Sequence, residues 1–91
     1  MEQQSVKIVN RLGMHARPSA MFVSHAAKFK SDVFVEKLGL KVNGKSIMGV
    51  MMLAAEQGSE LIIYAEGEDE KAAVEDLVQL VSSGFGDLKD L

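Results

Sequence analysis

Apolar and polar positions follow two different periods along this chain, and each period predicts a different kind of element. Strict alternation predicts strands, whereas apolar positions three or four residues apart predict helices. The alternation marks four strands, at residues 5–9, 32–37, 40–43 and 60–66. The helical spacing marks three helices, from Ala16 to about Phe29, from Ser46 to about Gln57, and onward from Asp69. This order predicts an α+β fold, a two-layer open-faced sandwich with three helices on one face of a four-stranded antiparallel sheet.

Each predicted helix carries an apolar stripe that should pack on the sheet. The stripe of the first helix consists of Ala20, Val23 and Ala27, widened by Phe22, Ala26 and Phe29. The stripe of the last helix consists of Ala73, Val74, Leu77, Leu80 and Val81. In the second helix Val50, Leu53 and Ala54 can face inward, while a different arc carries Ile47, Met48, Met51 and Met52. One short helix cannot bury all of these large side chains, so we expect some of them to be exposed.

Local signals set the ends of these elements. Leu38 and Gly39 form the turn of a predicted hairpin. Ser46 and Asp69 are favoured N-cap residues for the second and third helices. With 91 residues the chain should form one domain, in which residues 84–91 resemble a frayed tail.

Composition and charge argue against several classes of function. The chain has no cysteine and therefore no thiolate metal site, and its net charge of −3 argues against nucleic acid as a partner. Its polar start and the lack of a long apolar run predict a cytoplasmic protein without membrane insertion. Basic residues near one another in the first third predict a rim that steers an acidic partner. They are Arg11, Arg17, Lys28 and Lys30.

The candidate chemistry lies at residues 13–19, where a glycine turn leads into His15 and then Pro18. Proline is tolerated in the first helical turn, so a helix should begin near His15 or Ala16. There the free backbone N–H groups of Ala16 and Arg17 and the helix dipole form an anion site. A neutral imidazole of His15 could accept a phosphoryl group whose oxygens are held by those amides and by the Arg17 guanidinium. Spacing alone leaves open an ordinary helix-start histidine beside a solvated arginine.

We expect neither a cofactor nor a metal. The second histidine, His25, lies ten residues beyond His15 on the same predicted helix. That separation is about 15 Å along the axis, too far for the two side chains to share an ion.

Two motifs give this chain a family resemblance. The segment Leu12-Gly-Met-His-Ala-Arg-Pro18 resembles the active-site signature of HPr, the histidine-containing phosphocarrier family of the phosphoenolpyruvate-dependent phosphotransferase system. The segment Lys45-Ser-Ile-Met-Gly-Val-Met-Met-Leu53 resembles the second helix of the same family. The resemblance implies the same fold and a carrier, not an enzyme. His15 would accept a phosphoryl group from enzyme I through Nδ1 and donate it to an enzyme IIA domain, and we expect a monomer.

The second helix offers a docking surface and a regulatory site. Exposed methionines adapt to several partners, although methionine also fills gaps in cores, so Ile47, Met48 and Met51 form a candidate partner-binding surface. In some bacterial members of the family a dedicated kinase/phosphorylase modifies a serine in the context of Ser46. Phosphate at Ser46 would disfavour docking of an acidic partner beside Met48. The expected regulatory partners are that kinase/phosphorylase and a transcriptional regulator.

Two alternatives remain. Leu12-Gly-Met-His15 and Ser83-Gly-Phe-Gly86 are similar to carriers of the nitrogen-related regulatory branch, whereas Lys45-Ser-Ile-Met-Gly49 resembles sugar-branch carriers, which we favour. The other alternative is a noncatalytic docking module that binds a regulator through the second helix, with His15 incidental.

Overall fold

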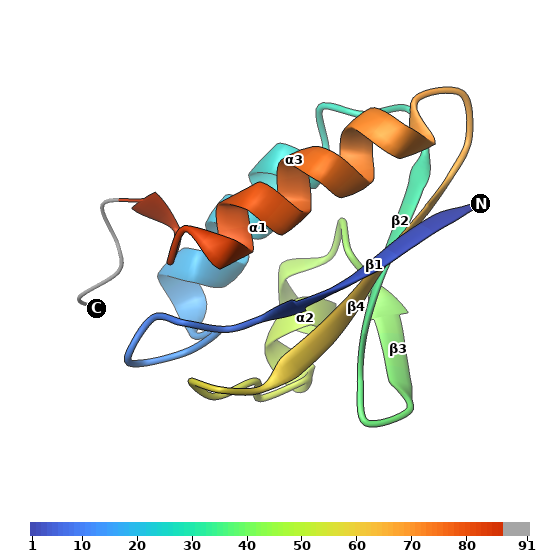
Figure 1. The fold of residues 1–91 in the computed structure, drawn as a ribbon. Helices are drawn as coiled ribbons and strands as arrows, with labels where there is room; N and C mark the ends of the chain where they lie inside the picture. The colour runs from blue at the N-terminus through green and yellow to red at the C-terminus, as the bar shows by residue number, and fades with distance from the viewer. Residues whose placement is uncertain (87–91) are drawn as a thin grey trace.

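The computed structural model describes residues 1–86 of the chain, which form four strands and three helices in the predicted order (Figure 1). The elements are β1 (Glu2–Lys7), α1 (Ala16–Ala26), β2 (Asp32–Lys37), β3 (Leu40–Asn43), α2 (Ile47–Met52), β4 (Glu60–Glu66) and α3 (Glu70–Ser82). No helix in this part of the chain is both long enough and apolar enough to cross a membrane.

The four strands form one antiparallel sheet in the order β1-β4-β2-β3. In the central strand β4, Leu61, Ile63 and Ala65 are buried, while Ile62 and Tyr64 between them are half-buried. This alternation means that helices cover one face of the sheet and leave the other open. Helices α1 and α3 run side by side across the covered face (Figure 1). The predicted open-faced sandwich is therefore confirmed.

The helices and the covered sheet face share one hydrophobic cluster. The predicted stripe of α3 is buried at all five positions, Ala73, Val74, Leu77, Leu80 and Val81. Strand β1 begins at Glu2, three residues before the predicted start, because its polar first half pairs with β4. Val6 and Ile8 still point into the core as their alternation predicts.

The buried face of α1 differs from the predicted stripe. Phe22 and Ala26 are fully buried, but Ala20 and Ala27 are exposed. The helix also ends at Ala26 instead of near Phe29. The buried face of α1 instead includes its first turn, where Ser19 is buried. The Ser19 hydroxyl donates to the Met14 carbonyl at 3.1 Å.

Helix α2 is shorter than the predicted segment to Gln57. It ends at Met52, and Ala54 leaves it in the left-handed region with φ of 48°. Ala54 is consequently exposed instead of facing inward, whereas Val50 and Leu53 are buried as predicted. The Lys37 ammonium on β2 donates to the carbonyls of Leu53 (3.2 Å) and Ala54 (3.1 Å), which places a cation at the end of the helix.

Asp69 stands at the N-cap position of α3, but its side chain makes no capping hydrogen bond. Its carboxylate instead accepts from the backbone N–H groups of Lys30 and Ser31, both at 2.9 Å, and from the Ser31 hydroxyl at 2.5 Å. These bonds, the Ser31 hydroxyl first among them, lower the pKa of Asp69 from 3.8 to about 2. Asp69 thus ties the start of β2 to α3, and the predicted capping bond is wrong.

The predicted tail does not begin at Gly84. Phe85 is fully buried in the core, and its N–H donates to the Leu80 carbonyl at 3.0 Å. A large aromatic side chain contributes enough apolar surface to hold this segment against α3. Residues 87–91 of the predicted tail lie outside the described residues.

Candidate functional site

The loop before α1 is held rigidly from two sides. The Gly13 N–H donates to the Asn10 carbonyl at 3.2 Å, and the Asn10 side-chain amide donates back to the Gly13 carbonyl at 2.8 Å. The Met14 N–H donates to the Ala55 carbonyl at 2.8 Å. Gly13 has φ of 70°, and a Cβ there would lie 2.3 Å from the Ala55 oxygen. Only glycine fits this crossing, which fixes the path of the chain into His15.

His15 occupies the N-cap position of α1 with an extended backbone, φ −86° and ψ −163°. Its carbonyl accepts the Ser19 N–H at 2.9 Å, and its side chain makes no capping bond. Pro18 has no N–H, so Ala16 and Arg17 supply the two N–H groups of this turn that find no acceptor within residues 1–86. Both lie at the positive end of the helix dipole, next to the imidazole.

The imidazole of His15 is half-buried, and its two nitrogens are not equivalent. Nε2 is buried and has no hydrogen-bond partner among the described residues. Nδ1 is therefore the ring nitrogen that a partner can reach. The ring borders a shallow hollow of about 340 Å³. The other residues of the hollow are Leu12, Met14, Met51, Ala54, Ala55 and Glu56.

Half of the six residues that line the hollow with His15 were not predicted from the sequence. Leu12 lies in the loop of the motif, but Ala54, Ala55 and Glu56 follow the early end of α2. The sequence predicts that α2 continues to Gln57, and a helix over these residues gives no reason to place them beside His15. No local pattern indicates that this segment returns to the histidine.

An exposed apolar surface adjoins the hollow. It consists of Ile47 (44% exposed), Met48 (78%), Met51 (42%) and Met52 (68%), and we call it the α2 patch. The prediction that some of these side chains are exposed is confirmed, since all four are. Met51 belongs both to the patch and to the hollow beside His15. Ser46 caps α2 as predicted, since its hydroxyl oxygen accepts the Gly49 N–H at 3.0 Å. The predicted site therefore joins two segments about thirty residues apart in sequence.

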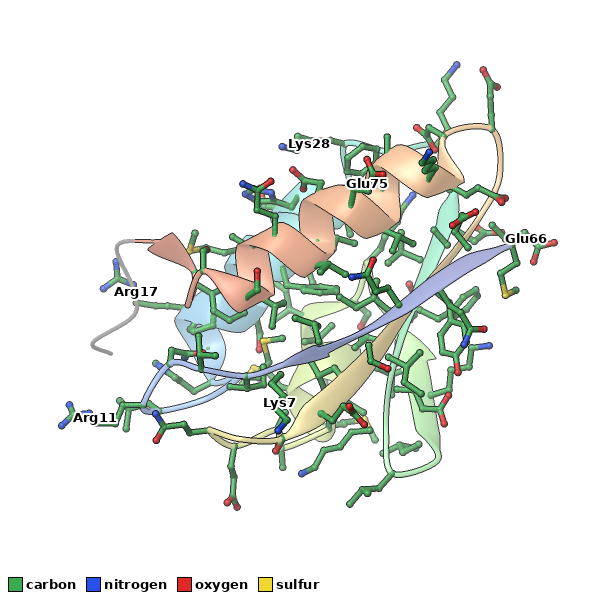
Figure 2. All side chains as sticks on the ribbon, viewed as in Figure 1. Lys7, Arg11, Arg17, Lys28, Glu66 and Glu75 are labelled. Carbon is green, nitrogen blue, oxygen red and sulfur yellow. The ribbon has the colours of Figure 1, made fainter. Side chains whose placement is uncertain are left out.

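The basic rim is smaller than predicted. Arg11 and Arg17 lie at the end of the molecule where α1 begins (Figure 2). Lys28 and Lys30 follow the opposite end of α1, so they do not contribute to a rim around His15. Glu66 lies far from both arginines (Figure 2), whereas Glu56 lines the hollow beside His15, so this end of the molecule carries both signs of charge.

The second histidine has a structural partner. His25 Nδ1 lies 2.8 Å from Asp76 Oδ2, a contact that joins α1 to α3, and both side chains are about one-third exposed. Within residues 1–86, no three histidine, aspartate or glutamate side chains are grouped as a metal site requires.

Some solved structures similar to this chain are dimers, which does not fit the expected monomer. The HPr dimer of Thermoanaerobacter tengcongensis is 48% identical with a TM-score of 0.76, covering 96% of this chain and 100% of that chain. Crh of Bacillus subtilis, described as a domain-swapped dimer, is 51% identical with a TM-score of 0.74, covering 91% and 95%.

Comparison with known proteins places the chain in a family. The family model described as the PTS HPr component phosphorylation site matches residues 2–83. Phosphocarrier protein HPr of Neisseria meningitidis is 47% identical over 96% of this chain and 98% of its own length. HPr-like protein Crh of Bacillus subtilis is 52% identical over 89% and 95%. A crystal structure of HPr from Thermoanaerobacter tengcongensis is 48% identical with a TM-score of 0.92, covering 96% and 98%. The chain belongs to the HPr family of phosphocarrier proteins of the phosphotransferase system.

Proposed function

We propose that His15 is the phosphoryl acceptor of this carrier, receiving the group from enzyme I and donating it to a sugar-specific enzyme IIA domain. The observation that carries this proposal is the position of His15 at the N-cap of α1, beside the unpaired N–H groups of Ala16 and Arg17. Membership of the HPr family supports the same assignment.

The transfer needs little chemistry from the carrier itself. The lone pair of His15 Nδ1 forms a bond to phosphorus while the bond between phosphorus and the donor group breaks, and the electron pair of that bond leaves with the donor. The phosphoryl oxygens then accept hydrogen bonds from the amides of Ala16 and Arg17 and pair with the Arg17 guanidinium. Such transfers depend mainly on positioning and charge stabilisation, so each partner supplies the rest of the site.

The α2 patch is the proposed docking surface for both partners. Burying one methionine or isoleucine side chain contributes about 1.5–3 kcal/mol, so a few such contacts suffice for a transient complex. Because Met51 also borders the hollow at His15, a partner seated on the patch brings its own reactive group beside the imidazole. Arg11 and Arg17 lie at the same end and favour an acidic partner.

Ser46 is the proposed regulatory site. Its half-buried hydroxyl precedes Ile47 and Met48 of the patch. A phosphate there adds negative charge beside an apolar docking surface, which disfavours an acidic partner without altering the fold. Similarity to Crh, a Bacillus subtilis protein named for catabolite repression, supports a regulatory use of this surface and a transcriptional regulator as a partner.

Intact-mass analysis after incubation with phosphoenolpyruvate and enzyme I tests the proposal. We expect one acid-labile phosphoryl group on the wild type and on His25→Ala, which removes the other histidine, and none on His15→Ala. Arg17→Ala should accept the group more slowly because the oxygens lose their cation. Labelling of His15→Ala, or no labelling of the wild type by an enzyme I that is active on its own carrier, would refute the proposal.

Ser46→Asp separates regulation from stability, because aspartate is also a favoured N-cap. We expect this variant to melt close to the wild type and to receive the phosphoryl group more slowly, whereas Ser46→Thr should transfer normally. Transfer from the phosphorylated carrier to a sugar-specific IIA domain, compared with a nitrogen-type one, decides between the branches.

A further inference from the structure

Three of the six methionines of this protein lie on one surface, the α2 patch. The chain has six methionines and neither cysteine nor tryptophan, so thioether sulfur is its most easily oxidised group. Met48 and Met52 are 78% and 68% exposed, and Met51 is 42% exposed. Met14, in contrast, is only 3% exposed although it also lies at the hollow. An oxidant in solution therefore meets the α2 patch before it meets the core.

Met1 is also 60% exposed, but it lies at the start of the chain, whereas the three exposed methionines of α2 form one continuous surface. Met51 and Met52 follow Met48 by three and four residues, which is the spacing of neighbours along one side of a helix. Met51 also lines the hollow with His15, so this surface reaches the edge of the phosphoryl site. An oxygen atom added to these side chains would lie in the surface that a docking partner must cover.

We propose that Met48, Met51 and Met52 are an oxidation site through which a peroxide reversibly weakens docking of the phosphotransfer partners. The inference rests on the proposed function of the α2 patch. In the reaction a peroxide transfers one oxygen atom to the thioether sulfur. Its O–O bond breaks, the sulfur loses two electrons, and hydrogen peroxide leaves as water. The sulfoxide is a strong hydrogen-bond acceptor, and burying it against an apolar partner without a donor is unfavourable.

The test compares transfer before and after treatment of the folded protein with hydrogen peroxide, with peptide mass spectrometry to map the sulfoxides. We expect Met48 and Met52 to be oxidised first and Met14 last. The kcat/KM of enzyme I for the oxidised carrier should fall by at least about tenfold, since losing one buried apolar side chain from the interface already has this effect. Methionine sulfoxide reductases should restore the rate.

A triple variant supplies the matched control. Met48→Leu, Met51→Leu and Met52→Leu together keep an apolar patch of similar volume but cannot be oxidised there. Peroxide should therefore leave the transfer rate of this variant equal to the variant's own rate before treatment, whatever that rate is. Met21→Leu alters a methionine outside the patch and should remain sensitive.

An unchanged rate for wild type fully oxidised at the three positions would overturn the inference. So would an equal loss of rate in the triple variant. Failure of the proposed function looks different, because the untreated wild type would then accept no phosphoryl group at all.

Discussion

Replacing Gly13 by alanine should strain the loop that delivers His15 in two separable ways. The first is conformational, because a residue with a Cβ at φ of 70° pays about 1–2 kcal/mol for the left-handed region. The second is steric, because the new Cβ would lie 2.3 Å from the Ala55 oxygen and 3.0 Å from the Glu56 Cα. Both neighbours are backbone atoms, so the loop itself must move, and such overpacking costs about 1–3 kcal/mol.

Gly58 provides the comparison that isolates the steric part. It has a similar φ of 89°, but a Cβ there would meet nothing within 4 Å. Gly58→Ala therefore carries the conformational cost alone, and the gain from restricting the unfolded chain is shared by both variants. The difference between them should be about 1–3 kcal/mol, so Gly13→Ala should melt at least about 4 °C below Gly58→Ala.

Urea unfolding followed by circular dichroism measures the difference, provided that the dependence on urea is the same for both variants. Phosphoryl uptake from enzyme I gives a second readout. Gly13→Ala should slow uptake because a displaced loop moves His15 relative to the α2 patch, whereas Gly58→Ala should not. Equal midpoints for the two variants would show that the loop does not depend on the close crossing at Ala55.

Three further predictions concern the rest of the fold. Asp69→Asn should lower the melting temperature at neutral pH. Because the folded pKa of Asp69 is about 2, below the ordinary 3.8, the carboxylate stabilises the fold above about pH 4. This stabilisation is lost as the pH falls toward 2. The melting temperatures of variant and wild type should therefore converge between about pH 4 and 2 and differ above pH 4. Ser46→Ala removes the acceptor of the Gly49 N–H and should cost about 1 kcal/mol in urea unfolding, and no loss would mean that water replaces the cap. Phe22→Ala should cost about 3–5 kcal/mol because Phe22 is fully buried, against less than about 0.5 kcal/mol for the exposed Ser24→Ala, and similar costs would contradict the assigned core.

Local periodicity correctly predicted the strands and helices that bury one regular face. Strand β4 and the apolar face of α3 appear at the predicted positions because alternation and helical spacing directly record which side is buried. The end of α2 could not be found in this way. The end of α2 coincides with a contact from outside the helix, because the Lys37 ammonium, sixteen residues before Leu53, donates to the Leu53 carbonyl. The partners of Asp69 could not be predicted either. Its position before a helix predicts a cap, whereas the carboxylate accepts from the N–H of Ser31, 38 residues away.

The candidate site likewise has one part that the local sequence predicts and another that only the fold brings together. Pro18 restricts where α1 can begin, so the sequence alone locates His15 and the two open amides beside it. The opposite wall of the hollow is made by Ala54 to Glu56, about forty residues later, and only the folded chain brings it near. The basic rim was overestimated because Lys28, close to His15 in sequence, is separated from it by the full length of α1.

The open face of the sheet gives the protein a built-in optical reporter. Tyr64 is the single tyrosine in a chain without tryptophan, and its hydroxyl donates to the Glu36 carboxylate at 2.5 Å while the Lys41 ammonium lies 4.0 Å from its ring. That hydrogen bond raises the pKa of Tyr64. Because a carboxylate acceptor quenches tyrosine emission, we expect the folded protein to emit weakly. Unfolding separates the pair and should brighten the protein. A partner on the α2 patch, across the sheet, should leave the emission unchanged, so one intrinsic fluorophore distinguishes loss of fold from docking.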